Sequence, residues 1–249
     1  MNVVEVRSSA GKRIAGAAKE FYRQAHAYDY EHHVDLAWEH CYSVFHSAFD
    51  GGERDENLLC LNLACYLANW GMYRGSSFLT KFDYQIHTPI VELILDDRFR
   101  LLHGASCETI ANDDALKLLF EVVKEMKAHY RKFRDKNVKK KPSSPISDVL
   151  ITKILLGTFG CVPAYDSYFV AGLGHADIGI TKAFNHKSIK ALAKLYADNM
   201  PVFESARENM VFGNGLVYPQ MKLLDMGIWN VGSKLLKCQR CDFKRKGER

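Results

Sequence analysis

The chain has 249 residues, of which 47% are hydrophobic and 25% are charged, a composition that is typical of a globular protein with one large core or two packed domains. A formal net charge of +5 permits a nucleic-acid partner without requiring one. The sequence lacks a signal-peptide pattern and any apolar run of the roughly 18 residues that a transmembrane helix needs. We therefore expect no membrane association and a cytoplasmic location, where seven mostly apolar-flanked cysteines stay reduced.

Apolar residues recur at helical spacing along most of the chain, and convincing strand alternation is absent. The expected helices lie at 14–30, 31–49, 56–71, from about 89, and at 112–134, 146–156, 164–172, 186–198, 201–210 and 219–236. The polar tail that follows is expected to fray. These patterns predict an all-α fold.

The clearest internal break is 132–145, which is rich in charge and then in Ser and Pro, and we expect a loop or hinge there. It divides the chain into helical subdomains at 1–131 and 146–249, packed with a cleft between them. Its basic side chains either contact nucleic-acid phosphates or form a solvated charge run; they are Lys132, Arg134, Lys136, Lys139, Lys140 and Lys141.

The segment 152–174 is the most informative for function. Lys153 opens an apolar helical run, and a turn at Val162-Pro163 then delivers Tyr165 and Asp166 to the start of a second apolar helix. A carboxylate held by a rigid turn between buried helices has the fixed position that catalysis needs. The alternative is that Asp166 is only a helix N-cap and Lys153 a surface lysine.

Lys153, the run ILLGTFG and the sequence Val162-Pro163-Ala164-Tyr165-Asp166 resemble the helix-hairpin-helix DNA glycosylase superfamily. In that family a helical hairpin grips the DNA backbone, its second helix often carries a catalytic lysine, and an aspartate follows a Val-Pro or similar turn. The family's Leu-Pro-Gly-Val-Gly hairpin is replaced here by PSSPISDVL, and the Lys-to-Asp spacing is shorter. The resemblance therefore implies Asp166 as the principal catalytic residue and Lys153 as the secondary one.

The implied reaction is hydrolysis of the N-glycosidic bond of a base in DNA, modified or not, in repair or anti-phage defence. A carboxylate near the anomeric carbon stabilises the oxocarbenium-like transition state or activates water. A desolvated lysine could instead attack the sugar and permit strand cleavage. This chemistry requires no metal or organic cofactor.

The segment 69–77, NWGMYRGSS, is a candidate base pocket. Trp70 and Tyr73 could stack on an extruded base, Arg74 could bind a phosphate, and Ser76 could lie in a backbone nest. Tyr165, next to Asp166, is a further candidate for contact with the base or the DNA. The alternative is a core Trp at a glycine-bearing helix end, with Arg74 paired to an acidic neighbour.

Two other functions stay open. Arg98 and His103, with four residues between them, match the spacing in the HEPN family of helical ribonucleases, where the Arg holds a phosphate and the His assists attack by the 2′-hydroxyl. The chain could also be a non-catalytic helical module that binds DNA or protein. Cys238 and Cys241 form a lone CxxC that lacks a second ligand pair, so we expect exposed thiols in preference to a metal site.

The segment 218–229 is expected to be a packing helix, with Met221, Leu224, Ile228 and Trp229 in the core. Asp225 would cap a helix or pair with a basic residue there. Such a helix could also close the cleft.

Overall fold

The structure, a computed structural model, describes residues 3–27, 33–137, 145–175, 179–213 and 215–247. Helices dominate these residues, as the hydrophobic periodicity predicts, so the fold is all-α. The helices are α1 (Val3–Ala25), α2 (Ala37–Phe49), α3 (Glu56–Asn69), α4 (Thr88–Ile94), α5 (Cys107–Ala111), α6 (Asp113–Asn137), α7 (Asp148–Thr158), α8 (Ser167–His175), α9 (His186–Asp198), α10 (Met200–Arg207) and α11 (Gln220–Gly247). Short 3-10 helices lie at Val34–Leu36, Phe78–Lys81, Tyr84–His87 and Asp97–Leu102.

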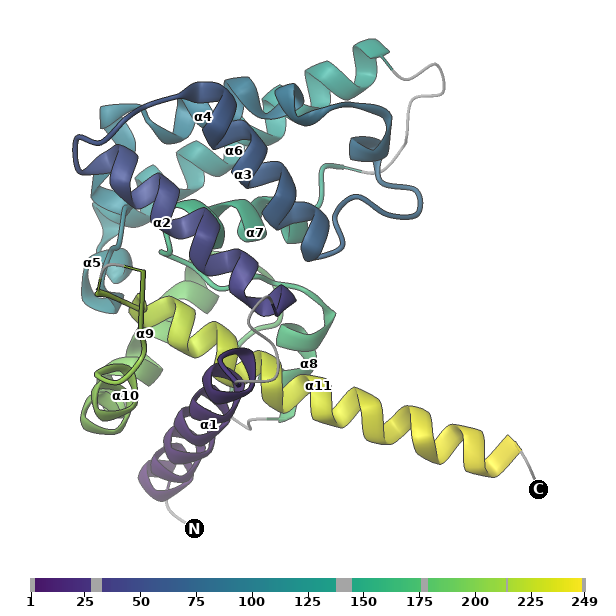
Figure 1. Ribbon diagram of the computed structural model, residues 1–249. Helices are drawn as coiled ribbons and strands as arrows, with labels where there is room; N and C mark the ends of the chain where they lie inside the picture. Colours follow the sequence, from purple (N-terminus) through teal and green to yellow (C-terminus); the bar gives the residue numbers. More distant parts are fainter. Residues whose placement is uncertain (1–2, 28–32, 138–144, 176–178, 214, 248–249) are drawn as a thin grey trace.

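The helices form two layers (Figure 1). One layer packs α2, α3, α4, α6 and α7 together, and the other packs α1 and α8 to α11. The two layers share one hydrophobic core, and α5 contacts both α6 and α9. Helix α1 therefore lies with the C-terminal helices, although the predicted division at 132–145 places it in the other subdomain. The expected cleft between subdomains is not confirmed among the described residues, because residues of both layers belong to one continuous hydrophobic core.

Helices α8 and α11 cross at two glycines. A methyl group added at Gly232 would overlap the carbonyl oxygen of Tyr168, and one added at Gly172 would overlap that of Ile228. Since neither residue has a Cβ atom, the two helix backbones come into direct contact at the crossing. This contact fixes α11 relative to the start of α8, which is where Asp166 lies.

Three local predictions differ from the structure. Helix α6 continues to Asn137, into the segment expected to be a loop, because Lys, Arg and Asp side chains are compatible with the exposed face of a helix. Helix α11 continues to Gly247, so the tail is helical and not frayed, and its C-terminal part extends away from the other helices (Figure 1).

The third difference is a small antiparallel hairpin between β1 (Val211–Phe212) and β2 (Leu216–Val217). Two-residue strands are too short to show the alternation by which strands are predicted. Among the described helices, none is long and apolar enough to cross a membrane.

Candidate functional site

Three segments that the sequence singles out meet where α3, α7, α8 and α11 converge. Trp70 is the C-cap of α3, and Gly71, with a φ of +75°, ends the helix directly after it. Lys153 comes from α7, and Asp166 immediately precedes α8. Helix α11 adds side chains three and four residues apart on one face. We call the resulting group the charge cluster; it consists of Trp70, Lys153, Asp166, Lys222, Asp225 and Trp229.

Asp166 both caps a helix and faces a lysine. Its Oδ1 atom accepts hydrogen bonds from the backbone N–H groups of Tyr168 and Phe169, each at 3.0 Å, which confirms the interpretation as an N-cap of α8. Its Oδ2 atom accepts the indole N–H of Trp229 at 3.3 Å and lies 3.7 Å from the Lys153 Nζ atom. One carboxylate oxygen is thus used structurally, while the other points into the charge cluster.

Lys153 is a buried residue, 5% exposed, so the expectation of a surface lysine is wrong. It was expected at the surface because it opens the apolar run, but α7 is covered by other helices all around. Its Nζ atom donates to the Trp70 carbonyl oxygen at 2.7 Å and lies 5.8 Å from the centre of the Trp70 ring. Burial lowers the pKa of Lys153, and the charges of Asp166 and Asp225 partly offset this.

A second ion pair completes the charge cluster. Lys222 and Asp225, 2% and 5% exposed, are joined by a contact of 3.1 Å between Nζ and Oδ2. The Oδ1 atom of Asp225 accepts the backbone N–H of Ala164 at 2.9 Å, and burial raises the pKa of this carboxyl. Lys222 is not among the residues predicted from the sequence. A signal was available, because Lys222 and Asp225 are the two charged residues in the apolar stretch 219–233.

The charge cluster is nearly closed. The space between its side chains is about 10 Å³, which is room for at most one water molecule. Trp70, Asp166 and Trp229 are half-buried and connect it to the surface. The Trp70 Nε1 atom is buried without a hydrogen-bond partner, the one such side-chain atom among the described residues. A nucleobase could therefore reach Asp166 only if an indole ring moved.

The other base-pocket candidates are distributed differently. The hydroxyl of Tyr73 lies 2.7 Å from His87 Nε2, away from the charge cluster, and Ser76 is exposed. Arg74 is exposed, but its guanidinium is near enough to contribute to lowering the pKa of Lys153. The structure therefore brings Trp70, Lys153 and Asp166 together, with Arg74 close by.

Tyr165 points to the opposite side from Asp166. Its hydroxyl lies 2.7 Å from the Ser188 Oγ atom of α9, and its ring packs against Phe184. It is a core residue and not part of a base pocket at the charge cluster. The basic residues Lys139, Lys140 and Lys141 lie outside the described residues.

The ribonuclease pair is not assembled within the chain. The guanidinium of Arg98 contacts Asp96 at 2.8 Å and Glu125 of α6 at 3.3 Å. His103 instead stacks on Phe49 of α2, at 4.1 Å between ring centres, and its Nε2 atom lies 3.2 Å from His46 Nδ1. Arg98 and His103 therefore face different helices. Burial, with the nearby His46, lowers the pKa of His103 to about 4.

Metal binding finds no support in the described part of the chain, where no three His, Cys, Asp or Glu side chains converge as ligands. Cys238 is an exposed free thiol, as expected, whereas the side chain of Cys241 lies outside the described residues.

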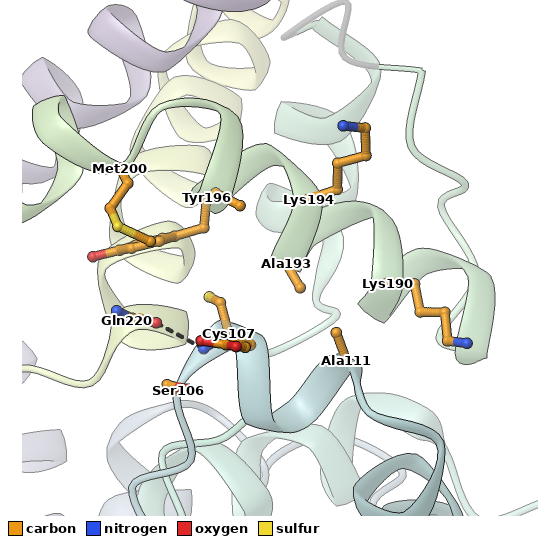
Figure 2. A pocket seen from close by; sticks show the side chains of 11 residues that line it. Ser106, Cys107, Ala111, Lys190, Ala193, Lys194, Tyr196, Met200 and Gln220 are labelled. Atoms are coloured by element: carbon orange, nitrogen blue, oxygen red, sulfur yellow. Dashed lines mark hydrogen bonds between the residues drawn. The ribbon is translucent and has the colours of Figure 1, made fainter.

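A more open groove of about 500 Å³ lies between α5 and α9 (Figure 2). Its walls are mainly apolar, with Cys107 and Ala111 facing Ala193. The side chains of Lys190 and Lys194 point away from it and pair with acidic residues, Asp113 and Asp198. The groove is separate from the charge cluster, with which it shares no lining residue.

No protein-family model, no curated protein and no solved structure matches this chain.

Proposed function

We propose that the protein is a DNA glycosylase that hydrolyses the N-glycosidic bond of a base in DNA, with Asp166 as the catalytic carboxylate. The observation that supports this most is the placement of Asp166 Oδ2 3.7 Å from a buried lysine, between two indole rings. Both residues belong to the segment that resembles helix-hairpin-helix glycosylases. A repair or anti-phage setting is part of the same proposal.

Asp166 would act on the sugar. As the bond from C1′ to the base breaks, its electron pair leaves with the base and positive charge develops on the sugar. A carboxylate already oriented by two backbone N–H groups and an indole N–H needs no reorganisation to stabilise that charge. Water then adds to C1′, and the proton that it loses passes, directly or through the Asp166 carboxylate, to the departed base, which leaves the neutral base and an abasic site.

Lys153 is the secondary candidate. A buried amine whose pKa is lowered has a larger neutral fraction at neutral pH, and only the neutral amine is a nucleophile. Attack by its Nζ atom on C1′ would displace the base, and breaking the bond from C1′ to the ring oxygen would then form a Schiff base, which permits strand cleavage. Without such attack the enzyme would remove the base without cutting the strand, and the Lys153 ammonium would hold Asp166 in place.

Entry of a base requires a rearrangement. Trp229 and Trp70 are half-buried and lie at the edge of the charge cluster, with 6.1 Å between their ring centres. Displacing one of them would open the path to Asp166 and leave an aromatic face for stacking. Exposed Arg74, next to this edge, would contact a phosphate.

The test uses oligonucleotides with a panel of modified bases, followed by alkali to cut at abasic sites. We expect base release by the wild-type protein and a loss of about 10²-fold or more in Asp166→Asn, a loss typical of removing one electrostatic contact to a transition state. The matched control is Asp55→Asn, because Asp55 caps α3 in the same way, far from the cluster. Base release that is unchanged in Asp166→Asn would refute the mechanism.

Two further measurements test whether DNA is the partner and whether Lys153 is a nucleophile. Affinity for duplex DNA should fall with rising salt, and replacing Lys139, Lys140 and Lys141 by Gln should flatten that dependence. Borohydride should trap a protein–DNA adduct if Lys153 is the nucleophile, and Lys153→Met should abolish it while Lys127→Met does not.

A second candidate, a non-catalytic binding module, is favoured by one observation. The charges of the cluster pair with one another around a space of only about 10 Å³, as in a purely structural network. Salt-dependent DNA binding with no base release from any substrate would support this module instead of the glycosylase.

A further inference from the structure

The buried pair Lys222–Asp225 has no part in the proposed reaction, yet it is connected directly to the residue that does. Asp225 Oδ1 accepts the backbone N–H of Ala164 at 2.9 Å, and Ala164 lies two residues before Asp166. The carbonyl oxygen of Ala164 in turn accepts the backbone N–H of Asp166 at 2.8 Å. Helix α11 thus holds the turn that delivers the catalytic carboxylate through a single side chain.

Lys222 restrains Asp225 from the opposite side. Its Nζ atom is 3.1 Å from Asp225 Oδ2 and lies 4.9 Å from the centre of the Trp38 ring. It is also 5.7 Å from the centre of the Trp70 ring, which lies 5.8 Å from the ammonium group of Lys153. The Trp70 indole is therefore shared between the two buried lysines, and cation–π attraction links the two ion pairs.

The same face of α11 also carries Trp229, whose indole N–H donates to Asp166 Oδ2 at 3.3 Å. The glycine crossing at Gly172 and Gly232 keeps α11 in contact with α8. Helix α11 consequently holds this region at two points: Asp225 accepts the backbone N–H of Ala164 in the turn before Asp166, and Trp229 donates to the Asp166 carboxylate.

From these contacts we propose that Asp225 is a positioning residue, which, restrained by Lys222, fixes the turn at 162–164 and so holds the Asp166 carboxylate against Lys153. Its catalytic consequence rests on the proposed function, but the positioning itself does not. A misplacement of about 1 Å at a catalytic group can cost about 10²-fold in rate, so the turn needs such a restraint.

Two substitutions separate the hydrogen bond from the charge. Asp225→Ala removes both, whereas Asp225→Asn keeps an oxygen that can accept the Ala164 N–H and removes the charge. The control is Asn230→Ala, because Asn230 is an equally buried residue of α11 whose Nδ2 atom donates to the Ala17 carbonyl oxygen of α1. Its loss perturbs α11 without touching the turn.

The first readout needs no DNA. Nuclear magnetic resonance of lysine-labelled protein follows the titration of Lys153, and the Trp229 indole N–H reports its hydrogen bond to Asp166 through its exchange with water. We expect Asp225→Ala to expose the indole N–H to exchange, and Asp225→Asn to keep it protected. The Asp225→Asn variant should also have a lower Lys153 pKa than the wild-type protein, because the charge of Asp225 raises that pKa.

The second readout is base release. We expect a loss of about 10²-fold in Asp225→Ala and recovery of most of the activity in Asp225→Asn, with Asn230→Ala close to wild type. If Asp225→Ala does not fold, the Asn variant carries the test alone: an indole N–H that loses protection although the Ala164 hydrogen bond can still form overturns the inference. If no substrate is processed by the wild-type protein, the proposed function fails while the resonance data still decide the positioning.

Discussion

Replacing Asp166 by Ala should destabilise the fold far more than the loss of a helix cap does. Asp166 caps α8 through two backbone N–H groups, and removing an N-cap costs about 1 kcal/mol. The same change leaves the buried ammonium of Lys153 without its carboxylate, and breaking a buried pair costs about 3–5 kcal/mol. Because the two atoms are 3.7 Å apart, longer than a hydrogen bond, the lower end applies, and the total is about 4 kcal/mol.

The assay is equilibrium unfolding in urea at pH 7 by circular dichroism, with Asp55→Ala as the cap-only control on α3. We expect the control to lose about 1 kcal/mol, so that the difference of about 3 kcal/mol measures the pair. A double-mutant cycle with Lys153→Met should then show a coupling between Asp166 and Lys153 of about 1–3 kcal/mol. Equal losses in Asp166→Ala and Asp55→Ala, or a coupling near zero, would refute the reasoning that these charges depend on each other.

Two other predictions concern the packing of the core. Burial lowers the pKa of His87 to about 4, so the unfolded chain binds more protons than the folded one between about pH 6.5 and 4. The free energy of unfolding is therefore expected to fall as the pH falls through this window, by up to about 3 kcal/mol for this group. Urea unfolding at a series of pH values should show a smaller loss in His87→Gln than in the wild-type protein. The exposed control His129→Gln should lose as much as the wild-type protein does. Gly232→Ala should destabilise the protein by several kcal/mol, because its methyl group would overlap the Tyr168 carbonyl. Gly16→Ala, with nothing near its added methyl group, should stabilise α1 by about 1 kcal/mol, measured by thermal unfolding. Equal effects of the two glycine substitutions would contradict the close crossing of α8 and α11.

The helices could be predicted from the sequence because burial on one face leaves a 3.6-residue period, and the expected helix at 186–198 has the bounds of α9. The layers could not be predicted in this way. The spacing of apolar residues shows that α1 has a buried face. It does not show that this face packs on α11, because the same spacing results whichever helix covers the face.

The candidate site was predictable in part. Asp166 was found because a Val-Pro turn fixes a carboxylate, and Trp70 because aromatic and glycine residues cluster around it. Lys222 was missed because its single charge lies in a run that reads as core packing, and only the fold places it beside Asp225. Tyr165 was wrongly placed in the pocket because it is next to Asp166 in the sequence. Its side chain points toward Ser188 of α9 instead, and the sequence of an irregular turn does not show in which direction each side chain points.

The packing of α1 on α11 has a consequence for how the chain folds. The bond from the Asn230 side chain to the Ala17 carbonyl spans 213 residues, and closing a loop of that length costs about 5 kcal/mol of chain entropy. During synthesis the apolar face of α1, with Ile14, Ala18 and Phe21, has none of its α-helical partners until α9 and α10 are made, and its main partner, α11, follows them. We therefore expect α1 to be the last helix to dock, the stretch that a chaperone would cover on the nascent chain, and the first to exchange its amide protons in the native state.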